Sequence, residues 1–60
     1  MTEQLQILKM RDVTRLTSLH RATIYRLIER EEFPRQIRLG RRRVGWRAAD
    51  ISDWINRQQP

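Results

Sequence analysis

The chain has no cysteine, so a fold of only 60 residues has to be held together by apolar packing. A chain this short buries only about 60% of the surface that its unfolded form exposes. Without cysteine, its one histidine cannot complete a structural zinc site, and no disulfide framework is available. The core therefore has to be a small apolar cluster, in which we expect Leu8, Val13, Leu16, Leu19, Ile24, Leu27, Ile28, Phe33, Ile37, Leu39, Val44, Trp46, Ile51, Trp54 and Ile55.

The charge balance points to a polyanionic partner. Thirteen basic residues stand against seven acidic ones, which gives a formal net charge of +6. Twelve of the basic residues are arginine, whose planar guanidinium makes bidentate contacts to phosphate and to guanine. This favours nucleic acid over a membrane surface. No signal peptide and no run of about 18 apolar residues is present, so we expect a cytoplasmic protein.

Apolar residues recur at helical spacing in three segments, over about residues 11–16, 21–31 and 48–57. Pro34 is expected to end the second helix, because proline breaks the hydrogen-bond ladder and the residue before it avoids the helical region. Four residues, 17–20, separate the first two helices. This spacing is that of a helix-turn-helix, whose second helix enters the DNA major groove, although many other helical hairpins share it.

Two segments after Pro34 alternate apolar and polar residues, as strands do. Ile37 and Leu39 lie in the first segment, Val44 and Trp46 in the second, and the turn sequence 40–42 separates them. An isolated hairpin is only marginally stable, so this one has to pack against the helices.

The predicted fold is therefore α+β, a small winged helix-turn-helix. It has three short helices and a two-stranded β-hairpin wing between the second and third. We expect one domain over residues 1–60 with an ordered core over about 7–57 and tails at 1–5 and 58–60.

This order of elements, with its particular residues, resembles the AlpA family of phage and prophage regulators. That family is related to small winged-helix excisionases and, more distantly, to MerR-like DNA-binding domains. The resemblance spans residues 8–56 and is carried by the segments LHRATIYRLI, FP, IRLG, VGWR and DWI. The family usually has glycine at the position of Ser18 and serine at that of His20. Ser18 therefore has to accept a positive φ or a different turn, and His20 is a poorer N-cap than serine.

The resemblance implies sequence-specific binding of double-stranded DNA and transcriptional regulation of phage or mobile-element genes, such as integrase or excisionase genes, without a cofactor. An excisionase that bends DNA and directs recombination is the alternative within the same class. A basic adaptor that binds an acidic protein or structured RNA through the same arginines is the alternative from another class. Other copies of the chain on adjacent sites and a phage-type integrase remain open as partners.

The candidate DNA contacts lie on the outer side of the second helix and on the hairpin. Arg26 is the best candidate for a base-edge contact, with Arg21 beside it, and Thr23 and Tyr25 suit phosphate. The arginines of the hairpin turn suit phosphate or a narrow minor groove, where the potential is most negative. A solvated basic face is the alternative. The full predicted set is His20, Arg21, Ala22, Thr23, Tyr25, Arg26, Arg30, Arg38, Arg41, Arg42, Arg43 and Arg47.

The two tryptophans allow a different interpretation, in which they stack on the bases of a single strand. Trp46 and Trp54 keep the period of their apolar neighbours, however, so we expect both in the core.

Two groups of residues have the composition of catalytic sites. Asp50 and Asp53 could form paired carboxylates, and Asp12, Ser18 and His20 could form a triad. Because a chain this small has little room for a pocket, we expect neither catalysis nor a metal ion.

Overall fold

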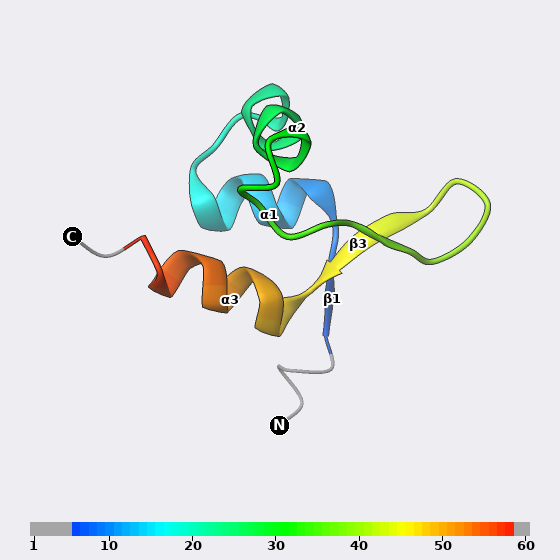
Figure 1. Ribbon diagram of the computed structural model, residues 1–60. Coiled ribbons are helices and arrows are strands. Elements are labelled where there is room, and N and C mark those ends of the chain that lie inside the picture. Colours follow the sequence, from blue (N-terminus) through cyan, green and yellow to red (C-terminus); the bar gives the residue numbers. More distant parts are fainter. Residues whose placement is uncertain (1–5, 59–60) are drawn as a thin grey trace.

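The computed structural model describes residues 6–58 and shows a small winged helix-turn-helix, as the sequence predicts. The loop between strands β2 and β3 extends away from the helices (Figure 1). The predicted tail at 1–5 lies outside the described residues, as do residues 59 and 60. In chain order the elements are β1 (Ile7–Leu8), α1 (Met10–Thr17), α2 (Arg21–Glu29), β2 (Ile37–Arg38), β3 (Val44–Arg47) and α3 (Ala48–Asn56).

The turn between α1 and α2 is fixed by side chains of α1. The Thr17 hydroxyl donates to the Val13 carbonyl at 2.7 Å and accepts the Leu19 N–H at 3.2 Å. Ser18 lies between Thr17 and Leu19 in the chain, and its backbone has φ 62° and ψ 23°, in the left-handed region. Of the two outcomes expected at Ser18, a positive φ or a different turn, the structure shows the positive φ, and Leu19 is half-buried against the core.

Helix α2 ends earlier than predicted, and Pro34 is not the cause. Glu31 has φ 59°, and its N–H donates to the Ile28 carbonyl at 3.0 Å. The next N–H, of Glu32, reaches back to the Leu27 carbonyl at 2.8 Å. This pair of bonds is a Schellman motif, which terminates a helix by turning one residue left-handed. The prediction of a helix to residue 31 was wrong because glutamate gives no sequence signal for this termination.

Helix α3 agrees with its predicted range, and Gln58 belongs to its end and not to a tail. The Gln58 N–H donates to the Ile55 carbonyl at 3.1 Å, and its side-chain amide donates to the Trp54 carbonyl at 3.0 Å. These bonds satisfy carbonyls that a helix C-terminus otherwise leaves unpaired. No helix within the described residues is long and apolar enough to cross a membrane.

The sheet has three strands, where the sequence predicted two. β3 is central and pairs antiparallel with both β1 and β2. Leu8 lies opposite Trp46 in the first ladder, and Ile37 lies opposite Gly45 in the second. The hairpin was predicted correctly, but β1 was missed because two residues carry no readable alternation. In Figure 1 β1 runs beside β3 at the base of the wing.

Gly45 makes this third strand possible. A Cβ atom at Gly45 would lie 2.8 Å from Ile7 Cγ2 and 2.8 Å from the Leu8 carbonyl oxygen. The second of these contacts is with backbone, which cannot move aside without breaking the ladder. A glycine inside a strand often marks such a close approach.

We therefore expect Gly45→Ala to lower the free energy of unfolding by roughly 2 to 3 kcal/mol, as overpacking does. Gly40→Ala is the matched control, because a Cβ there meets only Arg43 Cβ at 4.0 Å. Urea unfolding followed by circular dichroism measures both. Equal midpoints for the two variants would show that β1 does not pack across Gly45.

The core is smaller than the predicted set. Its buried members are Leu8, Val13, Ile24, Phe33, Trp46 and Ile51, and most of the other expected residues are half-buried. Three expected core residues are exposed instead: Leu16 (53%), Leu39 (45%) and Val44 (41%). Leu16 borders an open groove between α1 and α3, and the other two lie toward the tip of the hairpin, beyond the cover of the helices.

Both tryptophans bind the segment between α2 and β2. The Trp46 indole N–H donates to the Pro34 carbonyl and that of Trp54 to the Glu32 carbonyl, each at 2.8 Å. Phe33 lies between the two rings, with centroid distances of 6.1 Å to Trp46 and 4.8 Å to Trp54. Trp46 is fully buried and Trp54 half-buried, so the core assignment holds for both. This aromatic cluster fixes where the wing leaves the helices.

Candidate nucleic-acid interface

The outward face of α2 is the largest element of the candidate interface. Ile24 is fully buried, and Leu27 and Ile28 are half-buried, so these three residues anchor one side of the helix in the core. At 100° per residue the opposite side carries Ala22, Tyr25, Arg26, Glu29 and the C-cap residue Arg30, all of which are exposed. The core packing thus presents this face to the outside.

The N-cap residue of α2 does not use its side chain to cap the helix. His20 is the N-cap residue, with φ −70° and ψ 150°, and its imidazole makes no capping hydrogen bond. The expectation that His20 is a poorer cap than serine agrees with this geometry. Arg21 is exposed beside it, whereas Thr23 is half-buried.

The tip of the wing carries three adjacent exposed arginines, Arg41, Arg42 and Arg43. The Leu39 N–H donates to the Arg43 carbonyl at 2.8 Å and closes the loop. Within residues 6–58 the only ion pair joins Arg15 to Asp12, at 3.4 Å. The guanidinium groups of the tip and of α2 therefore have no carboxylate partner in the described part of the chain and can bind an external anion.

Strand register places Arg38 and Arg47, the two predicted contact residues on the strands, on opposite faces of the sheet. Arg38 lies opposite Val44, and residues directly opposite share a face, so Arg38 is on the face of the sheet that carries Trp46 and packs on the helices. Arg47 is one residue beyond Trp46 and lies on the other face, opposite Ile7. The structure thus places Arg38 on the face of the sheet that carries Trp46, and Arg47 on the opposite face.

The residues considered as a catalytic triad do not interact as one. The Asp12 carboxylate accepts the Lys9 N–H at 3.0 Å and an Arg15 guanidinium N–H at 3.4 Å. The Asp12 carboxylate therefore stabilises the start of α1, because a negative charge is favourable in the first turn of a helix.

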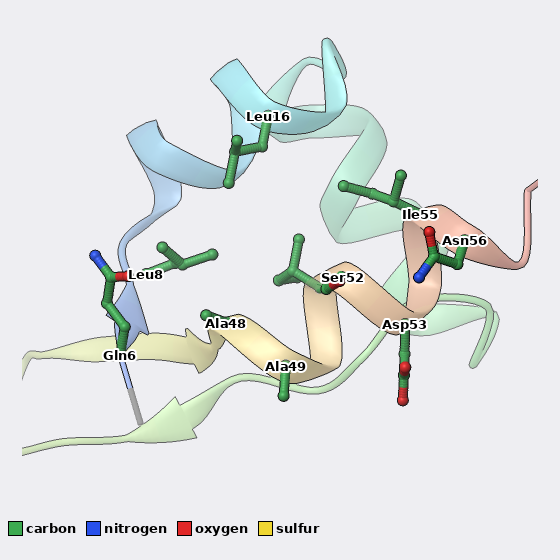
Figure 2. Close-up of a pocket in the computed structure, with 10 residues that line it drawn as sticks. Gln6, Leu8, Leu16, Ala48, Ala49, Ser52, Asp53, Ile55 and Asn56 are labelled. Carbon is green, nitrogen blue, oxygen red and sulfur yellow. The ribbon is translucent and has the colours of Figure 1, made fainter. Parts of the chain in front are cut away.

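A groove between α1 and α3 is lined mainly by apolar side chains. Leu8, Leu16 and Ile55 point toward the space between the two helices (Figure 2). Among the described residues, Asp53 is the only ionisable one that lines this groove, and its side chain points away from that space. The groove is therefore mainly an apolar surface.

Four carboxylates lie around a second depression beside Trp54. Asp50 and Asp53 line it together with Glu31 and Glu32, and two arginines, at 35 and 57, line it as well. In the part of the chain that the structure describes, no group of three or more histidine or carboxylate side chains is arranged to hold a metal ion.

Comparison with known proteins identifies the family. Residues 6–59 match the family model described as prophage CP4-57 regulatory protein (AlpA). The chain belongs to the AlpA family. This AlpA-family chain is also similar to the uncharacterized protein ORF88 of Enterobacteria phage P4, at 38% identity over 52 residues, which are 87% of this chain. It spans 59% of the length of that relative. The resemblance seen in the sequence is confirmed, and the protein is a member of a phage regulatory family.

One exposed residue on the outward face of α2 is absent from the predicted set. Glu29 lies three residues after Arg26 and seven after Ala22, so the helical wheel places it beside both. The predicted set omits Glu29 because it contains no acidic residue.

Proposed function

We propose that this AlpA-family chain is a sequence-specific double-stranded DNA-binding domain that regulates transcription of phage or mobile-element genes. The observation that carries the proposal is the division of α2 into two sides. Ile24 and its neighbours bury one side, and the other presents Ala22, Tyr25 and Arg26 on a helix that follows a helix-turn-helix turn. One domain then holds both the recognition helix and the wing.

In this proposal α2 lies in the major groove. Arg26 binds the O6 and N7 atoms of a guanine, with Arg21 beside it, because a guanidinium fork fits those two acceptors. Tyr25, Thr23 and the free imidazole of His20 bind phosphates and set the register of the helix on the duplex. The methyl group of Ala22 lets the helix backbone approach the bases closely.

The wing contributes affinity more than sequence preference. Its arginines reach the backbone or the minor groove, where the base-pair pattern is degenerate and the attraction mainly electrostatic. Arg38 and Arg30 extend this positive surface, whereas Arg47 lies on the other face of the sheet and contributes least. The chain acts by binding and not by catalysis.

A competition experiment tests this proposal against a basic adaptor for RNA or acidic proteins. Binding to a fluorescent duplex selected from a random library is challenged with the same duplex unlabelled, a random duplex, a structured RNA and polyglutamate. We expect the selected duplex to compete about 10³-fold better than the random one. Equal competition by RNA or polyglutamate would favour the adaptor and contradict the proposal.

A further inference from the structure

We infer that Glu29 is a specificity-determining residue whose carboxylate accepts a hydrogen bond from the N4 amino group of a cytosine in the major groove. The inference rests on the proposed DNA-binding function and goes beyond it, because it assigns a base and a discriminating role to an acidic residue.

The position of Glu29 gives the first argument. It is the last residue of α2, it is exposed, and it is on the side opposite the buried Ile24. Side chains three residues apart on a helix have Cβ atoms about 5–6 Å apart. The rise between base pairs is about 3.4 Å. If Arg26 reaches a base edge, Glu29 can therefore reach the same base pair or one of the next two.

The second argument is that this carboxylate is not neutralised within the described residues. The only ion pair there is between Arg15 and Asp12, and no hydrogen bond to the Glu29 side chain is formed. Arg26 and Arg30 lie on the same side of α2, yet neither has a nitrogen within 4.0 Å of a carboxylate oxygen. Glu29 therefore keeps all its acceptor positions for a ligand.

The third argument is the energetic cost of placing the Glu29 carboxylate in a groove lined by phosphates. A carboxylate there loses water and is repelled by the phosphate charge, and this cost remains unless a donor replaces the lost hydrogen bonds. Each base pair presents an amino donor on only one of its two strands, so many sequences lack the donor at the required position. Glu29 thus weakens binding to most sequences more than to the one that supplies the donor, and discrimination increases.

The chemistry of the base edges identifies that donor. Only the N4 amino group of cytosine and the N6 amino group of adenine donate in the major groove. Adenine carries the N7 acceptor beside its amino group, and that acceptor repels the second carboxylate oxygen. Cytosine has no acceptor beside N4 on its own edge. A cytosine within one or two base pairs of the guanine bound by Arg26 is therefore the expected contact.

The test compares Glu29→Gln with Glu32→Gln. Glu32 is exposed and lies outside α2, and its backbone, not its carboxylate, is engaged, by the Leu27 carbonyl and the Trp54 indole. The two variants thus lose the same charge at different places. Wild type and both variants are each used to select duplexes from a random library, and the dissociation constant is then measured for every single base-pair change in the selected site.

For wild type we expect one cytosine whose replacement weakens binding about tenfold. In Glu29→Gln that position should change its preference to adenine, because a glutamine amide pairs with the N6 and N7 atoms together. Binding of Glu29→Gln to random duplex should also tighten. Glu32→Gln should keep the wild-type preference for cytosine at that position.

Three results would overturn the inference. The first is that Glu29→Gln keeps the wild-type base preference, and the second is that it tightens binding to all sequences by the same factor. In either case Glu29 does not bind a base, while the proposed DNA-binding function stands. If wild type selects no sequence, the proposed function fails, and this inference fails with it. Thermal unfolding of Glu29→Gln at the wild-type temperature confirms that the comparison is made on folded protein.

Discussion

Replacement of Trp46 by alanine is expected to remove the cooperative unfolding transition. Trp46 is fully buried, its indole N–H binds the Pro34 carbonyl at 2.8 Å, and its ring meets Phe33 edge to face. Loss of a buried tryptophan costs about 3 to 5 kcal/mol, and a domain of this length has only about 3 to 9 kcal/mol of stability. Because a 60-residue domain with six buried core residues lies at the lower end of this range, little or none of the folded state should remain.

Circular dichroism during urea titration measures this effect, with Tyr25→Ala as the control. Tyr25 is also aromatic but 42% exposed on α2, so its removal should change stability by about 0.5 kcal/mol or less. The Tyr25 variant should lose DNA affinity instead. A wild-type transition in Trp46→Ala would show that the wing and helices are not held together by the aromatic cluster.

The second large effect separates the recognition helix from the wing. Arg26→Ala should weaken binding to the selected duplex by about 1 to 3 kcal/mol and leave binding to random duplex nearly unchanged. The joint change of Arg41, Arg42 and Arg43 to alanine should weaken both duplexes by similar factors. It should also reduce the slope of log K against log salt by about two to three, from a wild-type value of roughly −4 to −6.

Binding titrations on both duplexes at several salt concentrations measure these quantities, and Arg47→Ala is the control. Arg47 has the same charge but lies on the far face of the sheet, so its loss should have the smallest effect on the slope. If the wing variant lost only binding to the selected duplex while Arg26→Ala weakened both alike, the hairpin and not α2 would be the recognition element.

The sequence predicted the elements that depend on local periodicity. The three helices follow from apolar residues at helical spacing, and the hairpin follows from alternation around Gly40. The ends of elements depend on backbone geometry, which is harder to predict. Glu31 ends α2 in the left-handed region, a conformation for which glutamate has no preference.

Features that depend on distant contacts were missed. β1 exists because the chain crosses Gly45 of β3, and nothing within residues 7 and 8 indicates that partner. Leu16 has the spacing of a core residue, but α3 does not cover it, so it remains exposed.

The candidate site also has features that local periodicity predicts and features that depend on the folded chain. The outward face of α2 could be predicted, because a helical wheel needs only the anchor residues Ile24, Leu27 and Ile28. The separation of Arg38 from Arg47 could not, because it depends on strand register and on a third strand. Glu29 was visible on the wheel, but its unpaired carboxylate is a property of the folded chain.

Footprinting of the purified protein tests most directly whether this chain binds specific DNA sequences. The probe is the DNA that flanks its own gene and any neighbouring integrase gene, at physiological salt. We expect one or more short protected segments at protein concentrations about 10³-fold below those that protect random DNA. Arg26→Ala should need about 5- to 150-fold more protein to give these footprints. Uniform protection, or none at any concentration, would contradict sequence-specific recognition by α2.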